Sequence, residues 1–434
     1  MDLKEFLKTN KLKEGQTITF DYCGNSIEGI IIPSKTDLNL KLNSGYNAGF
    51  KLNKIKNIKI MSENKNVGKA KTIQITKNPK LPTVTILHTG GTIASRIDYT
   101  TGGVYANFDT QDILTMFPEL AKIANIESVF VSNMMSEDMS IDDFKKIAIV
   151  VSEQIKKETK GIIIGHGTDT LGYSAAALSF QLENCPIPIL FVGSQRSSDR
   201  GSSDAGMNLI CATEFVSKTN FKGIAVCMHN STNDDDCAIL IPTKVKKMHT
   251  SRRDAFKPIN ETPIALVNPK TKEIKWIKEK KEFEKTSGEF KLLNKFEKKV
   301  GLIKMHPLIT EKEIEFYKKE KYLGLIIEGT GLGHTPIREN DSFIKTIKEL
   351  IDSGCVVGMT SQCINGRVHP NVYTNLRKLS SIGVIYCEDM LSETALIKLS
   401  WLLGNYSKNE TKEMLSKNLR GEITNFTKIN TFEY

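Results

Sequence analysis

Two short segments of this chain bring together residue types that bind and transform small polar molecules. Residues 89–94 read Thr-Gly-Gly-Thr-Ile-Ala, where adjacent glycines let the backbone turn tightly and present N–H donors beside the Thr92 hydroxyl. Residues 166–170 read His-Gly-Thr-Asp-Thr and add two hydroxyls and a carboxylate. If both segments lie at one edge of a sheet, they form a single polar site.

Each segment directly follows an apolar run that predicts a buried strand. Such runs occupy residues 83–88, 161–165, 189–193 and 223–227. Apolar residues at helical spacing predict a helix over residues 141–155, which Ser140 and Asp143 open as an N-terminal capping box. Alternating strands and helices predict an α/β fold with a parallel sheet and helices on both faces, where ligands bind at the carboxyl ends of the strands.

Other interpretations of these segments stay open from the residues alone, and for the first segment by itself a structural glycine turn is the favoured one. Neither segment has the Gly-Lys-Ser/Thr ending of a P-loop or the Gly-x-Gly-x-x-Gly spacing of dinucleotide-binding turns, whereas a purely structural glycine turn is always an alternative. The acidic run at residues 234–236 is better explained as a solvated loop than as a metal site. His166 and Asp169 could be ligands, but the other histidines form no metal-type cluster, so we expect no metal.

The rest of the chain predicts three parts. Residues 1–80 contain short alternating strands between positions 14 and 61 and then a polar linker, which is typical of a small barrel-like or SH3-like β-module. Residues 81–285 form the larger α/β domain with the two segments above. Residues 286–434 form a linker and a smaller α/β domain, and the Lys/Glu-rich stretch 271–299 reads as a surface excursion or connection. Strands of the smaller domain are expected at 300–304, 323–327 and 355–359, and helices around 311–321, 341–352 and 392–403.

Charge and composition limit the class of protein. The chain has 434 residues and a net charge of +10, of which +8 falls in residues 1–80, so this module could attract RNA or simply reflect a lysine-rich composition. No apolar run reaches the ~18–20 residues of a membrane span, and the first residues lack the apolar core of a signal peptide. Eight sparse cysteines without a Cys-x-x-Cys pair fit a reduced, cytoplasmic compartment.

Taken together, the two threonine-containing segments resemble the signatures of the L-asparaginase/glutaminase superfamily. The resemblance covers about residues 83–410 in the expected order. It includes Ser-Glu-Asp-Met at 136–139, Lys-Met-His-Thr-Ser at 247–251, Thr-Ser-Gln-Cys at 360–363 and the segment from 388 to 404. It implies two asparaginase-like α/β domains and hydrolysis of a side-chain amide through a threonine acyl-enzyme.

The resemblance also implies roles for individual residues. Thr92 is expected to be the nucleophile and Lys247 its base, acting through the hydroxyl of Thr168, while Asp169 orients this pair and anchors the substrate ammonium group. On spacing alone, Lys247 belongs to a charge run that would more simply be a solvated face.

The remaining expected site residues surround the substrate. Ser136 and Glu137 are expected to hold its α-end, and Gly91 and Gly167 belong to the turns that supply backbone oxyanion donors. The family's lid tyrosine is assigned to Tyr99, with Tyr105 as the alternative.

The N-terminal module is similar to that of one branch, the D subunits of archaeal glutamyl-tRNA(Gln) amidotransferases. The branch implies a glutaminase that supplies ammonia to an E subunit, which converts Glu-tRNA(Gln) to Gln-tRNA(Gln). No cofactor is expected in this chain, with ATP and Mg²⁺ at the partner, and a homodimer within a heterotetramer is expected. Either glutamine or asparagine could be the amide donor. The alternative is a free cytoplasmic L-asparaginase with an appended domain.

Overall fold

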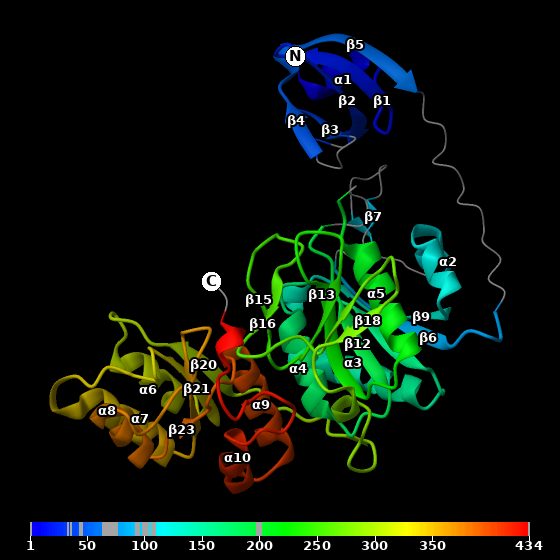
Figure 1. Cartoon of the computed structure of the whole chain (residues 1–434). Helices are drawn as coiled ribbons and strands as arrows, with labels where there is room; N and C mark the ends of the chain where they lie inside the picture. Colours follow the sequence, from blue (N-terminus) through cyan, green and yellow to red (C-terminus); the bar gives the residue numbers. More distant parts are fainter. Residues whose placement is uncertain are drawn as a thin grey trace.

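The computed structural model describes residues 2–32, 34, 37–42, 47–62, 77–91, 96–97, 104–105, 110–196 and 202–432 (Figure 1). These residues form a small N-terminal β-module and two α/β domains. Two of the expected site residues, Thr92 and Tyr99, lie outside the described residues.

The N-terminal module is an antiparallel sheet of five strands in the order β4-β3-β2-β1-β5, preceded by one short helix. Its apolar core gathers Phe6 of the helix with Phe20, Leu40 and Phe50 of the strands. The expected short strands are confirmed, whereas closure of the sheet into a barrel stays a prediction. The elements are α1 (Leu3–Thr9), β1 (Thr17–Tyr22), β2 (Asn25–Ile32), β3 (Leu38–Leu42), β4 (Asn47–Phe50), η1 (Leu52–Lys54) and β5 (Ile55–Ser62).

The larger α/β domain is built on an eight-stranded sheet in the order β18-β17-β14-β13-β12-β10-β6-β9. Four of its five parallel strands coincide with the apolar runs of the sequence. The strands are β6 (Thr83–Gly90), β9 (Asn125–Met134), β10 (Gly161–Gly165), β12 (Pro188–Val192), β13 (Gly223–His229), β14 (Cys237–Leu240), β17 (Ala265–Val267) and β18 (Ile274–Trp276).

Helices cover both faces of this sheet, as the alternation of strands and helices predicts. On one face α5 (Ala205–Lys218) and α2 (Thr110–Met116) pack on a core that includes Ile86, Ile163 and Leu190. On the other face α3 (Ile141–Ile155) and α4 (Leu171–Gln181) pack on a core that includes Leu87, Ile164 and Phe191. Successive strand residues therefore bury opposite faces, which explains the uninterrupted apolar runs. Asp143 accepts hydrogen bonds from both the backbone N–H and the hydroxyl of Ser140, so the predicted capping box is confirmed.

The core of the large sheet is parallel, as the sequence predicts, but one edge of the sheet is antiparallel. β14, β17 and β18 run antiparallel to their neighbours, so the large sheet is mixed. The stretch 271–299 is also more than a surface excursion, because β18 lies within it and extends the sheet. Trp276 of β18 packs near Phe215 of α5, with ring centroids 5.6 Å apart.

The smaller α/β domain has a fully parallel four-stranded sheet in the order β20-β21-β22-β23. Helices α6, α7 and α8 cover one face, and α9 and α10 cover the other (Figure 1). The three strands and three helices expected here are confirmed. The elements are β20 (Val300–Lys304), α6 (Glu311–Lys319), β21 (Gly324–Gly329), α7 (Ser342–Asp352), β22 (Val356–Ser361), α8 (Thr374–Ser381), β23 (Ile385–Tyr386), α9 (Ser392–Asn405) and α10 (Lys408–Leu415).

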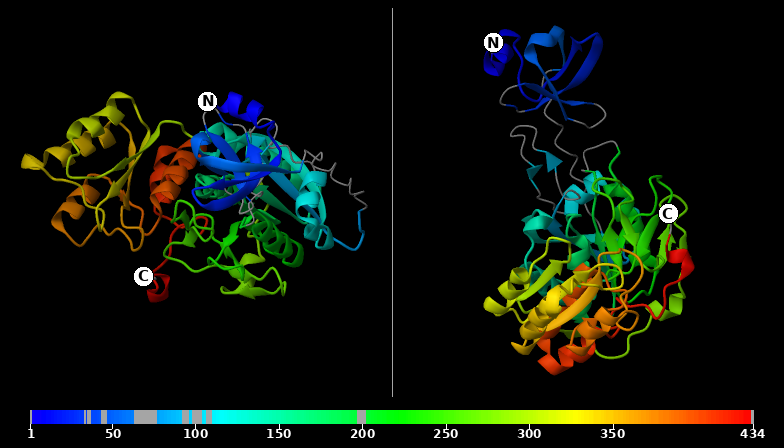
Figure 2. Two further views of the ribbon diagram at one scale, coloured as in Figure 1. Left: turned by 90° about the horizontal axis from the view of Figure 1, so that it is seen from above. Right: turned by 90° about the vertical axis from the view of Figure 1, so that its left-hand side faces the viewer.

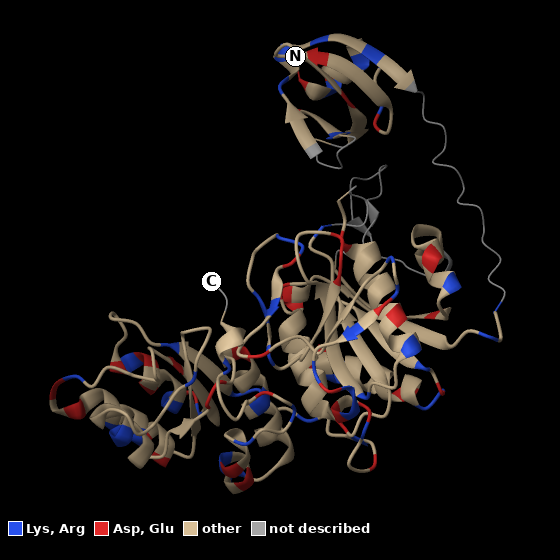
Figure 3. Ribbon diagram, in the orientation of Figure 1, with Lys and Arg blue, Asp and Glu red and all other residues tan. Residues whose placement is uncertain are grey.

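The two α/β domains lie side by side and share an apolar contact between α4 and α9 (Figure 2). Phe180 of α4 stacks on Trp401 of α9, with ring centroids 5.5 Å apart. Phe144 of α3 approaches Phe296, which precedes β20, in the same cluster. Charged residues of both signs are spread over both α/β domains (Figure 3). Any site at the boundary between the two α/β domains therefore depends on how the smaller domain packs against the larger one.

Candidate active site

The described parts of the two polar segments, residues 89–91 and 166–170, lie at the carboxyl ends of adjacent parallel strands. β6 and β10 are neighbours in the sheet, and His88 is paired with Gly165 at their ends. After β6 the chain adds β9 on one side, and it then crosses to β10 on the other side. The crevice between β6 and β10 is therefore a topological switch point, which is where open α/β sheets bind ligands. We call residues 89–91 and 166–170 the β6/β10 rim.

Gly91 and Gly167 let the two halves of the rim and a third segment touch. Gly91 has a φ of +80°, and a Cβ on it would lie 2.5 Å from both the amide nitrogen and the Cα of Gly167. A Cβ on Gly167 would in turn lie 2.8 Å from the hydroxyl of Ser136. The contact of Gly91 is with backbone, which cannot move aside, and its positive φ also favours glycine, so the two turns approach this closely only with glycine at position 91. The Thr170 hydroxyl also donates to the carbonyl of Ser136 at 2.6 Å, so all three segments converge.

Lys247 reaches the same rim from a separate hairpin. Its Nζ donates to the hydroxyl of Thr168 at 2.9 Å and to Oδ1 of Asp169 at 2.8 Å. The Lys247 side chain is 17% exposed and that of Asp169 is 64% exposed, so the amine is largely enclosed while the carboxylate still meets solvent. The solvated-face interpretation of this lysine is therefore wrong. The amine, the hydroxyl and the carboxylate form one hydrogen-bonded group at the rim.

The hairpin that carries Lys247 lies outside the large sheet. β15 (Val245–Lys247) pairs antiparallel with β16 (Phe256–Pro258), and Lys247 is directly opposite Phe256. Val245 and Phe256 are buried in the same core as α4, which seats the hairpin beside the rim. Because successive residues of a strand face opposite sides, Lys246 and Lys247 lie on opposite sides of β15, and only one of them shares the side of the buried Val245.

His166, which directly follows β10 at the rim, is fully buried. Its Nδ1 lies 2.6 Å from the carbonyl of Gly167, which requires an N–H at that position. Its Nε2 lies 3.1 Å from the sulfur of Met139. Burial lowers the pKa of His166 from 6.5 to about 4, although the Gly167 carbonyl acts in the opposite direction. His166 is therefore neutral near pH 7 and supports the loop rather than carrying a charge.

Acidification is expected to destabilise the chain through its buried histidines. Burial also lowers the pKa of His88, at the end of β6, from 6.5 to about 4. A histidine whose folded pKa lies below its unfolded pKa favours the folded state above about pH 6.5, and this contribution is lost as the pH falls toward 4. Between pH 7 and pH 5 each of the two should lower the free energy of unfolding by about 2 kcal/mol.

Urea unfolding at a series of pH values checks this dependence. The midpoint should fall between pH 7 and pH 5, and it should fall less steeply in His166→Asn. His306→Asn, at a histidine that is 46% exposed, should have the slope of the unchanged chain. Equal slopes for the unchanged chain and His166→Asn would contradict the assignment.

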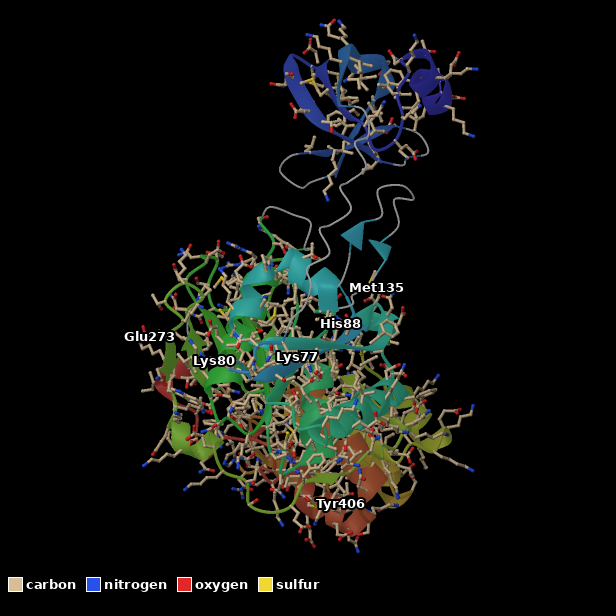
Figure 4. The ribbon with its side chains drawn as sticks, turned by 90° about the vertical axis from the view of Figure 1, so that its right-hand side faces the viewer. Lys77, Lys80, His88, Met135, Glu273 and Tyr406 are labelled. Atoms are coloured by element: carbon tan, nitrogen blue, oxygen red, sulfur yellow. The ribbon has the colours of Figure 1, made fainter. Side chains whose placement is uncertain are left out.

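The structure gives fewer contacts for the other expected site residues. Glu137 belongs to the short 3-10 helix η4 (Ser136–Asp138) and is exposed, next to the buried Ser136. The preceding Met135 lies at the end of the large domain from which the hairpin of β7 (Arg96–Ile97) and β8 (Val104–Tyr105) projects (Figure 4). The backbone of Tyr105 lies in β8, whereas Thr92 and Tyr99 are outside the described residues.

Metal and membrane features are not found in the described part of the chain. Among residues whose positions are given, no group of three or more His, Cys, Asp or Glu could hold a metal ion. Over the same ranges, no helix has both the length and the apolar character needed to cross a lipid bilayer. The acidic run at 234–236 lies in an exposed loop, where Asp234 pairs with Arg253.

Sequence reasoning missed the polar residues that support the rim. The Thr89 hydroxyl donates to the carbonyl of Gly165 at 2.9 Å and ties the end of β6 to the end of β10. The Ser132 hydroxyl of β9 donates to the carbonyl of Thr89 at 3.0 Å. Thr89 could have been singled out from the sequence, because it belongs to one of the two polar segments. Its hydrogen-bond partner could not, because that depends on which strands are neighbours in the sheet.

Three family models match successive parts of the chain. The GatD N-terminal domain matches residues 12–61, the N-terminal asparaginase domain matches 83–282, and the glutaminase/asparaginase C-terminal domain matches 299–415. Among solved structures, the thermostable L-asparaginase from Thermococcus kodakarensis has a TM-score of 0.71 at 31% identity, over 79% of this chain and all of that chain. L-asparaginase I from Vibrio cholerae has a TM-score of 0.67 at 27% identity, over 79% of this chain and 99% of that chain.

Relatives that match nearly the whole chain specify the family. The D subunit of glutamyl-tRNA(Gln) amidotransferase from Methanococcus maripaludis strain C7 is 44% identical over 98% of both chains. The D subunits from Thermococcus kodakarensis and Pyrococcus furiosus are 44% and 43% identical, over 99% and 100% of this chain and 96% and 97% of theirs. Because the likeness includes the N-terminal module as well as both α/β domains, the chain belongs to the family of glutamyl-tRNA(Gln) amidotransferase D subunits.

Proposed function

We propose that this chain is the glutaminase subunit of a tRNA-dependent amidotransferase that converts Glu-tRNA(Gln) to Gln-tRNA(Gln). One observation carries the proposal: the amine of Lys247 contacts the Thr168 hydroxyl and the Asp169 carboxylate at the rim, where Gly91 meets Gly167. A base, a hydroxyl and a carboxylate beside closely packed backbone amides are the parts that acyl transfer from an amide requires.

The first chemical step is attack on the side-chain amide of the substrate. Thr92, which follows Gly91 in sequence, supplies the hydroxyl that attacks the carbonyl carbon. Its proton passes through the Thr168 hydroxyl to the amine of Lys247, which the 2.9 Å contact allows. Collapse of the tetrahedral intermediate breaks the C–N bond, and the proton leaves with the nitrogen as ammonia. The product on the chain is an ester of Thr92.

Water then hydrolyses this ester and restores Thr92, with the same base accepting the proton of the water. Ser136 and Glu137 hold the α-end of the substrate beside Asp169, which also faces its ammonium group. Backbone N–H groups of the rim, in the turns of Gly91 and Gly167, stabilise the oxyanion. A lid closes over the substrate, and we assign its tyrosine to Tyr99.

The released ammonia needs an acceptor that is activated elsewhere. Turning a γ-carboxylate into an amide requires ATP and Mg²⁺, which we assign to a partner E subunit that also binds Glu-tRNA(Gln). We further propose a cytoplasmic assembly in which a homodimer of this chain lies within a heterotetramer. The chain itself holds no cofactor in this scheme, and the donor is glutamine or asparagine. The N-terminal β-module, as a barrel-like unit, serves the assembly rather than hydrolysis.

A free L-asparaginase with an appended domain is not favoured. The two asparaginase structures cover 79% of the chain, whereas the three D subunits match it over 98% or more. The difference corresponds to the N-terminal module, which matches a family model of its own.

An ammonia assay with and without the partner separates the two functions. The full chain is assayed for glutamine and asparagine hydrolysis alone, with the E subunit, and with the E subunit, Glu-tRNA(Gln) and ATP-Mg²⁺. We expect Gln-tRNA(Gln) to form only in the complete mixture, together with a rise in ammonia release of roughly tenfold or more. Rapid asparagine hydrolysis by the chain alone, unchanged by partner or tRNA and without Gln-tRNA(Gln), would support the free asparaginase instead.

A further inference from the structure

The hairpin that carries Lys247 is attached to the smaller domain on both sides of that lysine. Lys246 forms an ion pair with Glu393 of α9, with Nζ and Oε1 2.5 Å apart. Lys244 forms a second ion pair with Asp389, with Nζ and Oδ2 2.7 Å apart, and both side chains are fully buried. The charge run 244–247, which looked like a solvated face, is therefore mostly a bridge between domains.

Neutral hydrogen bonds strengthen the same attachment. The Thr394 hydroxyl of α9 donates to the carbonyl of Thr243 at 3.0 Å. Asn260, which follows β16, accepts from the N–H of Gly366 at 2.8 Å and donates to its carbonyl at 3.1 Å. Both ends of the hairpin thus contact the smaller domain, whereas β15 pairs with β16 and with no other strand of the described ranges.

Lys246 and Lys247 are neighbours on one short strand, and their side chains are consequently held on opposite sides of it. Adjacent residues of a strand point to opposite sides, and here one amine is held by α9 and the other by the rim. A three-residue strand outside the main sheet has little backbone pairing to resist rotation about its own axis. Its orientation depends on such side-chain anchors.

We propose that Glu393 and Asp389 of the smaller domain are positioning residues that set the place of the Lys247 amine at the rim, an inference that rests on the proposed amide hydrolysis. The smaller domain then contributes to catalysis without touching the reacting atoms. The contact of β15 with α9 of the smaller domain holds β15 in place. The position of β15 in turn sets the distance from the Lys247 amine to the Thr168 hydroxyl. A small displacement of a proton acceptor is costly, because a misplacement of about 1 Å can lower a rate by about a hundredfold.

Of the two ion pairs, Lys246–Glu393 is the one to test. It borders a cavity of about 200 Å³ that Lys304, Glu328 and Cys363 also line, so water can hydrate the lysine once its partner is neutral. The side chains of Lys244 and Asp389 are both fully buried, and removing one partner would leave a buried, unpaired charge that threatens folding. Glu393→Gln changes the charge at nearly constant shape.

In Glu393→Gln we expect kcat for amide hydrolysis to fall about tenfold with KM within a factor of two, because the proton acceptor moves while the substrate contacts do not. The loss is smaller than a hundredfold because Val245 and Phe256 still anchor the hairpin in the core. The assay uses the full chain with its partner subunit, and kcat is expressed per active site by covalent titration. Glu349→Gln is the matched control, because Glu349 pairs with Lys318 at 2.8 Å on the helices of the same domain, away from the hairpin.

A reversed pair distinguishes positioning from a general loss of stability. Lys246→Glu combined with Glu393→Lys should restore kcat to within about threefold of the unchanged chain, since the bridge is re-formed. A kcat per active site for Glu393→Gln within twofold of the unchanged chain would overturn the proposal. So would a loss confined to KM or to the active fraction. If the unchanged chain hydrolyses neither amide, the proposed function itself fails and the positioning role fails with it.

Discussion

Replacing Lys247 by methionine is expected to lower kcat for amide hydrolysis by about a thousandfold, because the proton of the attacking hydroxyl then has no acceptor. Methionine keeps the length and apolar stem of the side chain, so the substitution removes the amine and little else. The Thr168 hydroxyl and the Asp169 carboxylate lose the donor that contacts both of them at 2.9 and 2.8 Å. KM should change by less than about threefold, because the amine contacts the chain rather than the substrate.

Lys257→Met is the matched control for this prediction. Lys257 belongs to the same hairpin, but its amine contacts the carbonyl of Asn230 and the carboxylate of Asp254 rather than the rim. Steady-state kinetics on both variants, with folding checked by thermal denaturation, decides the matter. A Lys247→Met chain that keeps more than a tenth of the activity would show that another group accepts the proton.

Thr92→Ala should lower kcat by about ten-thousandfold or more, a larger loss than any other single substitution. Without its hydroxyl no ester forms, and only the oxyanion donors and substrate positioning are left to speed direct attack by water. Substrate binding should persist, because Ser136, Glu137 and Asp169 are unchanged. Single-turnover measurements with glutamine would therefore show binding without ammonia release.

Thr92→Ser is the informative companion, because it keeps a hydroxyl and removes a methyl group. It should keep activity within about a hundredfold of the unchanged chain, since serine performs the same nucleophilic chemistry. Equal, complete loss in both variants would point to a structural role for Thr92. Full activity in Thr92→Ala would move the nucleophile elsewhere.

The parts of the fold that could be predicted are those whose signal is local. Four of the parallel strands of the large sheet follow from apolar runs, and the helix Ile141–Ile155 follows from its periodicity and from the capping box of Ser140 and Asp143. The rim could also be predicted, because glycine turns at the ends of parallel strands must gather at one edge of the sheet. Gly91 and Gly167 then meet as expected.

The parts that could not be predicted depend on partners far away in sequence. Lys244 and Lys246 looked solvated, yet their carboxylate partners lie about 145 residues further along the chain. The antiparallel edge of the large sheet consists of strands of three or four residues, too short to show a period. Sequence motifs predicted which residues gather at the rim, but the hairpin and ion pairs that hold Lys247 required the structure.

Mapping the covalent adduct of the diazo-ketone analogue of glutamine tests most directly whether the rim performs amide hydrolysis through Thr92. Trypsin should release Thr92 in a peptide of residues 81–96 and Thr168 in a separate peptide of residues 161–196. We predict label on peptide 81–96 at Thr92, no label in Thr92→Ala, and much slower labelling in Lys247→Met. Label on peptide 161–196, or labelling of Thr92→Ala at the rate of the unchanged chain, would contradict the assignment of the nucleophile and with it the proposed reaction.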